Sequence, residues 1–226
     1  MSEEPVYFND TFTTDRMDLL VWEQKLSEGW DRIGYQFYRK RYEHLPGIDD
    51  NGNFGWHRYE LMPLRFRLDN TFLFTKSQQN NKKRNKDLRF VYDIASITDE
   101  KIMLFDAWYV TRFGSLNFIE QWVSGINKPF PSIECCVYDK GKLIACSYFD
   151  TTPNASYSTL AFYDPNEMRR SLGTYTMILE IEFDLRNKKM FHYPGHAHRQ
   201  NTMYDYKKKF ANPERFDWDK LDWVAI

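Results

Sequence analysis

Cysteine is scarce in this 226-residue sequence, and neither sign of charge is in excess. The three cysteines, Cys135, Cys136 and Cys146, include no pair at the spacing of a zinc knuckle, and adjacent cysteines do not readily bridge each other. They are expected to be small buried residues rather than a disulfide framework or a metal site. Lysine and arginine total 31 against 32 aspartate and glutamate residues, so net charge does not indicate a nucleic-acid-binding protein.

Long apolar runs are also lacking. The longest, such as residues 19–22, are far shorter than the ~20 residues that cross a bilayer. Residues 1–5 have neither the basic start nor the apolar run of a signal peptide. We therefore expect a soluble, cytoplasmic protein that does not act in a membrane.

Aromatic residues, in contrast, are abundant at 18% of the chain, within a composition that is 42% hydrophobic and 28% charged. This balance is typical of globular proteins and excludes disordered, collagen-like and coiled-coil chains. The length suffices for one large domain, or for a medium domain with a smaller partner, and the core needs no disulfides.

The pattern of elements predicts an α+β protein. Helices are expected at 15–28, 98–123 and 173–187, and strands at 33–42, 62–68, 132–138, 142–149, 156–163 and 190–193, with a turn-rich stretch at 46–55. The change in the pattern of predicted elements along the chain predicts a small N-terminal α/β lobe over residues 1–95. Residues 96–226 are expected to form a mixed sheet with crossing helices.

Arg170 and Gly173 form an R-x-x-G motif between the last long predicted strand and a predicted helix. Backbone N–H groups at the start of a helix have no partner within the helix, and the helix dipole is positive there. Such a junction favours a phosphate or a developing oxyanion. In the fold of the GNAT N-acetyltransferases, this position binds the pyrophosphate of acetyl-CoA.

Several short segments resemble one known family in their order along the chain. They are GWDRIG (29–34), YR (38–39), PLR (63–65), SQ (77–78), RNKDL (84–88), FYDP (162–165), RSLGTY (170–175), YPG (193–195), MYDYK (203–207) and FANPE (210–214). Together they span most of the chain and resemble the arginyl-tRNA–protein transferases, including the bacterial members that transfer leucine.

The resemblance implies a GNAT-like fold and a tRNA-dependent aminoacyltransferase of the N-degron pathway, without a cofactor. Its partners would be an aminoacyl-tRNA carrying arginine or leucine and a protein or peptide with N-terminal Asp or Glu, whose α-amine is the acceptor. The chain departs from the family pattern where a cysteine pair is replaced by a longer stretch at 40–62, and at Gln79, Asn80 and His196. The transferred amino acid and the acceptor therefore stay open at this point.

Three residues are expected to be catalytic: Arg170 and Gly173 of the loop, and Asp150, which would orient or deprotonate the amine. The other residues on matching motifs are expected to bind substrate, and they are Arg65, Ser77, Gln78, Arg84, Asn85, Ser171, Leu172, Thr174, Tyr175, Tyr204, Tyr206 and Lys207. Among them, Arg65, Arg84 and Lys207 would contact the acidic acceptor or tRNA. Tyr204 and Tyr206 would stack on the terminal adenosine or pack at a strand edge.

Two further groups of residues each have more than one possible role. The basic stretch 76–89 would contact phosphates or be an ordinary solvated face. His192, His196 and His198 lack an acidic or cysteine partner at an obvious spacing, so we expect them to be structural or to line the substrate site, with no metal bound.

Two alternative functions remain at this level. One is an acyl-CoA-dependent N-acetyltransferase that uses the same loop. Tyr175 argues against this alternative, because its side chain would crowd a pyrophosphate. The other is a non-catalytic relative that binds tRNA or N-terminal peptides.

Overall fold

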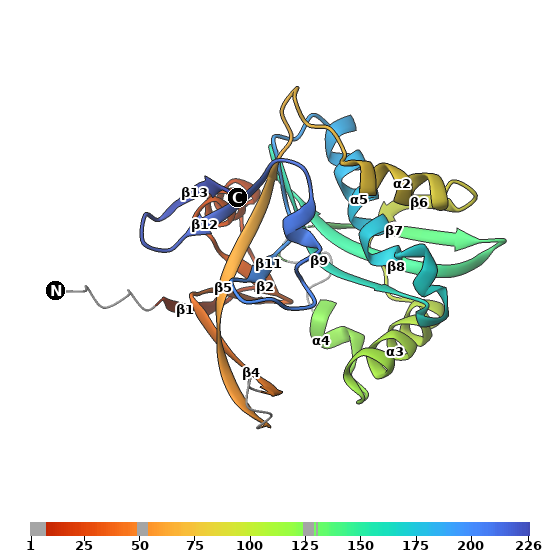
Figure 1. The fold of residues 1–226 in the computed structure, drawn as a ribbon, viewed down its shortest axis with the longest axis horizontal. Coiled ribbons are helices and arrows are strands. Elements are labelled where there is room, and N and C mark those ends of the chain that lie inside the picture. Colours follow the sequence, from red (N-terminus) through yellow and green to blue (C-terminus); the bar gives the residue numbers. More distant parts are fainter. Residues whose placement is uncertain (1–7, 49–53, 124–128, 130) are drawn as a thin grey trace.

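A computed structural model describes residues 8–48, 54–123, 129 and 131–226, which form two sheets and their covering helices (Figure 1). The smaller sheet is antiparallel in the order β1 (Asn9–Thr13), β3 (Gln36–Lys40), β2 (Asp31–Ile33). Helix α1 (Leu19–Ser27) begins where the Asp18 side chain accepts a hydrogen bond from the Leu20 N–H, and it buries Trp22 and Leu26 against Phe37 of β3.

The larger sheet has ten strands, eight of them in the order β13-β12-β5-β10-β9-β8-β7-β6, while β4 and β11 also pair with β5. Their bounds are β4 (Tyr42–Ile48), β5 (Phe54–Arg67), β6 (Arg89–Ile94), β7 (Ser132–Asp139), β8 (Lys142–Thr151), β9 (Ala155–Tyr163), β10 (Phe191–Tyr193), β11 (His196–His198), β12 (Pro213–Asp217) and β13 (Asp222–Ala225). Among the described pairs, β9 and β10 alone run parallel. Helix α5 (Leu172–Arg186) connects them.

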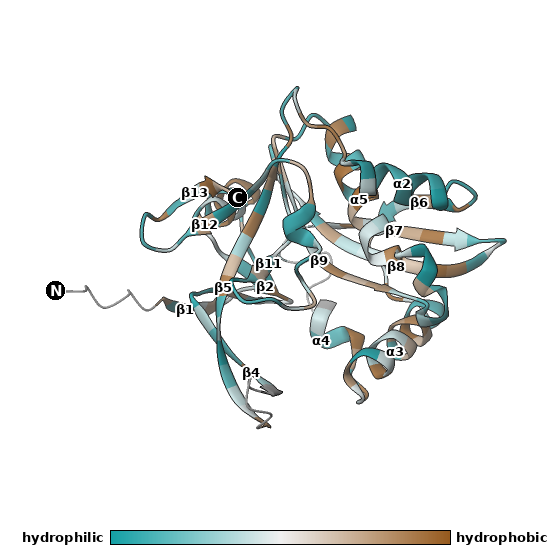
Figure 2. Cartoon of the chain, viewed as in Figure 1, coloured by the Kyte–Doolittle hydropathy of each residue, from teal (hydrophilic) through white to brown (hydrophobic). Residues whose placement is uncertain are grey.

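Helices cover both faces of the strands β7–β9 (Figure 1). α2 (Lys76–Arg84) and α5 lie on one face, and α3 (Asp99–Phe113) with α4 (Ile119–Val123) lies on the other. Successive side chains of a strand point to opposite faces, so Cys135 packs in the α5 layer and Cys136 in the α3 layer. All three cysteines are free and buried, as the sequence predicted. Figure 2 shows the complementary pattern, with hydrophilic residues along α2.

The structure confirms the predicted α+β class, with a large mixed sheet and helices that cross it. The predicted helices near 15–28, 98–123 and 173–187 correspond to α1, to α3 with α4, and to α5. Of the turn-rich stretch 46–55, residues 49–53 lie outside the described residues, and the rest belongs to β4 and β5.

The division at residue 95 stays a prediction. Strands β5 and β6, which precede residue 95, hydrogen-bond to strands β10 and β7, which follow it. Residues 54–94 therefore contribute to the layers of the larger sheet. In the described part of the chain, no helix combines the length and apolar character needed to cross a membrane.

Candidate functional site

A cavity of about 480 Å³ opens beside the first turns of α5. Its walls are strand β9, the start of α5, helix α3, strand β2 and the segment 194–207. The lining thus comes both from the helix-covered part of the larger sheet and from strand β2 of the small N-terminal sheet. Because these separate stretches of the chain meet here, the cavity is a product of the tertiary fold rather than of any local motif.

The start of α5 contributes hydrogen-bond donors to this cavity. The 3-10 helix η1 (Pro165–Arg170) ends at Ser171, which takes a left-handed conformation with φ 51°. The N–H of Thr174 donates to the carbonyl of Ser171 at 3.1 Å, whereas those of Leu172 and Gly173 have no acceptor in the described part of the chain. Ser171, Gly173 and Thr174 all line the cavity, so an anion or a carbonyl oxygen can reach these donors.

Helix α2 holds this loop in place. Amide groups of Asn81 and Asn85 donate to the carbonyl of Arg170 at 3.2 and 3.0 Å, and Arg84 donates to the carbonyl of Arg169 at 2.8 Å. Gln78 forms a capping box at the start of α2, and Ser77 is exposed on the same helix. None of Ser77, Gln78, Arg84 and Asn85 lines the cavity, so the structure places them beside the loop.

Arg170 points away from the cavity. Its guanidinium pairs with Asp87 at 3.0 Å, Glu167 at 3.1 Å and Asp139 at 3.7 Å. Three carboxylates already neutralise this cation, which leaves it poorly placed to hold a phosphate in the cavity.

Leu172 and Tyr175 are also turned away, into the core beneath the sheet. The Tyr175 hydroxyl lies 3.5 Å from the carbonyl of Asn85, and the ring does not line the cavity. The expected crowding of a pyrophosphate by Tyr175 is therefore wrong, because the helix turns this side chain toward Leu88 and Phe149.

Asp150 lies outside the cavity, in a buried ion pair with Arg32. Both carboxylate oxygens of Asp150 accept hydrogen bonds from Arg32 at 2.6 Å, and Ser132 donates a third at 2.7 Å. Arg32 itself lines the cavity. Asp150 thus touches the site only through Arg32, and its catalytic role stays a prediction.

Arg65 is likewise occupied away from the cavity. Its Nε lies 2.6 Å from a carboxylate oxygen of Glu214, and its guanidinium stacks on Phe191 and Trp223 at 4.2 and 4.6 Å from their centroids. These contacts fasten β5 to β12 and β13.

Tyr204, Tyr206 and Lys207 do line the cavity. The ammonium group of Lys207 donates to the carbonyls of Pro194 and His196 at 2.7 and 3.1 Å, and burial lowers the pKa of Lys207 to about 8. Arg112 of α3 supplies a second cation, which makes no ion pair with any residue that the structure describes. The cavity therefore has two basic groups available to an acidic ligand.

A buried carboxylate completes the site. Glu180 of α5 lines the cavity, accepts a hydrogen bond from the Ser158 hydroxyl and lies 3.6 Å from Nε2 of His192. Behind it, Nδ1 of His192 lies 2.7 Å from Asp184. Burial raises the pKa of Glu180 and of Asp184. A carboxylate with a raised pKa in a cavity suits proton transfer.

The sequence reasoning missed Glu180 and Arg112 as members of the site, whereas His192 was expected to be structural or to line the substrate site. A signal for Glu180 existed, because Glu180 and Asp184 stand one turn apart among apolar residues of a buried helix, where unpaired acids are rare. Arg112 had no comparable signal, since an arginine near the end of a helix is ordinary.

The family model described as "Arginine-tRNA-protein transferase, C terminus" matches residues 72–217. An "Aspartate/glutamate leucyltransferase" of Shewanella putrefaciens (strain CN-32 / ATCC BAA-453) is 26% identical over 203 residues, which are 87% of this chain and 79% of that protein. A second "Aspartate/glutamate leucyltransferase", of Xanthomonas oryzae pv. oryzae (strain PXO99A), is 27% identical over 172 residues, which are 69% of this chain and 66% of that protein.

Solved structures with a similar arrangement include L-PGS from Bacillus licheniformis and FemX, both with a TM-score of 0.49. Their sequence identities are 12% and 6%, over 85% and 87% of this chain and 54% and 65% of theirs. The family match, in contrast, covers well over half of the chain and includes η1, α5 and the cations of the cavity. The chain therefore belongs to the arginine-tRNA–protein transferase family, whose enzymes use an aminoacyl-tRNA as donor and a protein as acceptor.

Proposed function

We propose that this chain transfers leucine from charged tRNA to the α-amine of proteins that begin with Asp or Glu. The observation that carries the proposal is the cavity, where the N-terminus of α5, the carboxylate of Glu180 and the cations of Arg112 and Lys207 line one space. Its relatives named "Aspartate/glutamate leucyltransferase" agree with this assignment.

The reaction requires the protein mainly to position the two substrates and to transfer protons. The amine nitrogen attacks the ester carbonyl carbon of aminoacyl-tRNA, a C–N bond forms, and the C–O bond to the ribose breaks. An α-amine has a pKa of about 7.7–8.0, so a useful fraction is neutral at physiological pH. The N–H groups of Leu172 and Gly173 would stabilise the oxyanion that develops on the carbonyl.

Glu180 is the proposed general base. It would take the proton that the amine loses, and a proton would return to the departing ribose oxygen, so charge balances over the reaction. His192 lies directly behind Glu180, and Asp184 holds His192 by Nδ1, which directs Nε2 toward Glu180 and Ser158. This arrangement lets a proton be shared within the buried group.

The lining of the cavity supports leucine as the transferred residue. Trp108, Phe113, Leu160 and Met168 give it an apolar wall. The acidic residues in the lining are Asp31 and Glu180, and each already has hydrogen-bond partners. An arginine side chain would need a carboxylate of its own, whereas leucine needs only apolar surface.

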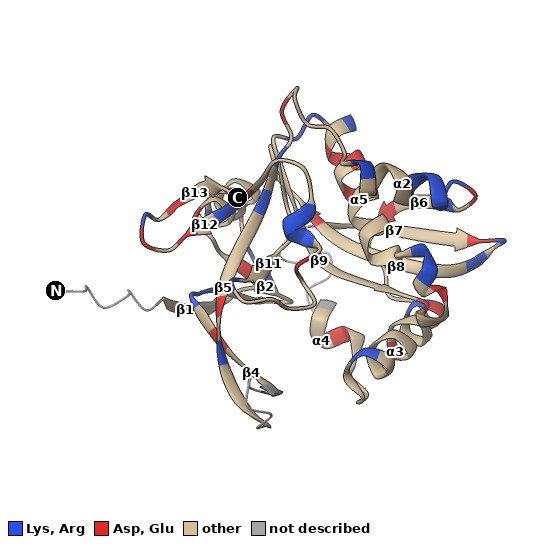
Figure 3. Cartoon of the chain, in the orientation of Figure 1, with Lys and Arg blue, Asp and Glu red and all other residues tan. Residues whose placement is uncertain are grey.

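The exposed cations of α2 would contact the tRNA. Figure 3 shows Lys and Arg gathered along α2, where Lys76, Lys83 and Arg84 are exposed. Because Arg84 also holds the loop at Arg169, a tRNA on this surface would continue directly to the edge of the cavity. Tyr204 and Tyr206 remain the proposed stacking partners for its terminal adenosine.

The Arg112→Gln substitution tests the acceptor site. A charge-assisted hydrogen bond contributes about 1.5–3 kcal/mol, so kcat/KM for a peptide beginning with Glu should fall roughly 10–100-fold. The measurement is peptide transfer kinetics with leucyl-tRNA. Arg16→Gln, at an exposed position outside the cavity lining, should leave kcat/KM unchanged. An Arg112→Gln enzyme that keeps full kcat/KM for the Glu peptide would contradict the assignment.

The Gly173→Val substitution tests the donor site. A Cβ at Gly173 would lie 3.1 Å from Cε1 of Tyr163, and the larger side chain would occupy the space beside the free N–H groups. A displacement of about 1 Å at a reacting group can cost on the order of 10²-fold, so transfer should fall about 100-fold. Gly173→Ala, which needs only a small shift of Tyr163, should retain most of the activity. Equal activity in both variants would remove this loop from the site.

A further inference from the structure

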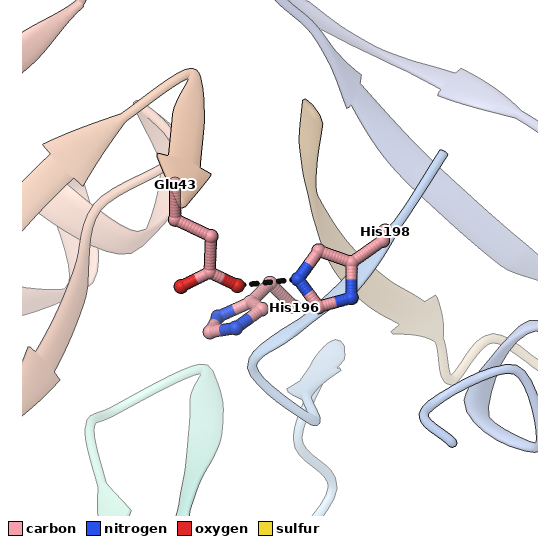
Figure 4. Close-up of side chains that lie close together, drawn as sticks. All are labelled: Glu43, His196 and His198. Atoms are coloured by element: carbon pink, nitrogen blue, oxygen red, sulfur yellow. Dashed lines mark hydrogen bonds and ion pairs between the residues drawn. The ribbon is translucent and has the colours of Figure 1, made fainter. Parts of the chain in front are cut away.

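Three side chains that can bind a metal lie close together (Figure 4), and one of them, His196, lines the cavity. They are Glu43 of β4 and His196 and His198 of β11, and their ligand atoms all lie within 4.8 Å of one another. Strand β5 brings them together, because the Leu61 N–H donates to the carbonyl of Arg41 and the Glu60 carbonyl accepts from the Arg199 N–H. The start of β4 and the end of β11 are thus fixed at one point of β5.

Each histidine is held through its other nitrogen. Nδ1 of His196 lies 2.7 Å from Oδ2 of Asp31, and Nδ1 of His198 lies 3.0 Å from the Thr202 hydroxyl. When the Nδ1–H of His196 donates to the carboxylate of Asp31 at this distance, Nε2 keeps its lone pair. Metal-binding histidines are characteristically oriented in this way.

Glu43 and His198 face each other directly. A carboxylate oxygen of Glu43 is in contact with Nε2 of His198, whose side chain is fully buried. Tyr59 and Tyr204 pack around His198 with ring centroids 5.3 and 5.7 Å away. A positive charge between these two acceptors, either a proton or a metal ion, would satisfy both in this enclosed place.

We propose that Glu43, His196 and His198 bind one zinc ion, through a carboxylate oxygen and the Nε2 atoms. Two imidazoles and one carboxylate are a ligand set that zinc accepts, with a fourth position left open. His196 lines the cavity, so the open position faces the substrate space. Mg²⁺ and Ca²⁺, which require oxygen ligands, should not bind.

The test measures binding of zinc alone, without tRNA or peptide, so its outcome does not depend on the proposed transferase activity. The full-length chain is treated with a chelator, dialysed and titrated with a zinc salt in a calorimeter. We expect one zinc per chain, with affinity that rises with pH because the ligands must lose their protons. Cobalt(II) should give the intense visible absorption of a four-coordinate site.

Variants separate the site from adventitious binding. Glu43→Gln, which preserves shape, should abolish the one-to-one phase, and Asp31→Asn should weaken it about 10–100-fold. His44→Ala is the matched control, because His44 is an exposed neighbour of Glu43 on β4. Circular dichroism establishes that each variant is folded, and histidine NMR signals of the wild type report zinc contact without any substitution.

Two results would overturn the proposal. One is a wild-type protein that binds zinc no better than the folded Glu43→Gln variant. The other is zinc addition that leaves the signals of His196 and His198 unmoved. Either would mean that a proton alone joins Glu43 to His198.

Discussion

Replacing Glu180 with glutamine should reduce the rate of aminoacyl transfer by about 10²–10⁴-fold, the usual contribution of a general base. The amide keeps the shape of the carboxylate and can still bond to Ser158, but it cannot take the proton of the amine. The measurement is a single-turnover rate with saturating leucyl-tRNA and a Glu-starting peptide. Glu182→Gln is the matched control on the same helix, where Glu182 pairs with Lys82 outside the cavity lining.

The pH dependence of the same single-turnover rate is a second test of Glu180 as the general base. Burial raises the pKa of Glu180, so the wild-type rate should rise with pH as this carboxyl loses its proton. The Glu180→Gln enzyme should lack that part of the profile. A variant with an unchanged rate and an unchanged profile would exclude Glu180 as the base.

The ionised carboxylate of Glu180 should also lower the free energy of unfolding at neutral pH. Its pKa is raised above the unfolded value of about 4.3, so the folded state binds its proton more tightly. The free energy of unfolding therefore falls as pH rises from the unfolded pKa through the folded one. Glu180→Gln should be at least as stable as the wild type above that range, which separates lost activity from lost folding.

Asp150→Ala should lower the free energy of unfolding by about 3–5 kcal/mol, because it leaves the buried guanidinium of Arg32 without its carboxylate. The side chains are 2% and 0% exposed, so water cannot replace the lost partner. For a chain of this size, each kcal/mol shifts Tm by about 2–4 °C, and thermal unfolding will show the change.

The double variant Asp150→Ala with Arg32→Met gives the control. Removing both charges should restore much of the lost stability, since an apolar replacement of a buried pair is often nearly neutral. If Asp150→Ala instead unfolds like the wild type but loses transfer, Asp150 acts directly in the chemistry and the structural reading is incorrect.

Local patterns in the sequence predicted much of the fold. The β7–β8 hairpin follows from the turn at residues 139–141 between two apolar runs, and α5 follows from its entry motif and its length. Strand β5 was only partly foreseen, because its first half pairs with β4 and alternates between exposed and half-buried residues. Local spacing cannot show that β5 then continues into the larger sheet.

The site was harder to predict, because its contacts join distant parts of the chain. Motif matching found Gly173, Ser171, Thr174, Tyr204, Tyr206 and Lys207, all of which line the cavity. It also selected Arg65 and Asp150, since a motif records residue types but not their ion-pair partners. Nothing local to Asp150 shows that Arg32 is its partner, and nothing local to His198 shows that Glu43 faces it.

The most direct test of the proposed function offers the protein bulk charged tRNA together with short peptides that begin with Asp, Glu, Ala or Lys, and records the peptide masses. The account predicts a mass gain of one leucine residue on the Asp and Glu peptides alone. A mass gain of one arginine residue would contradict the proposal that the apolar wall of the cavity favours leucine. No mass gain on any peptide by the folded protein would contradict the transferase itself.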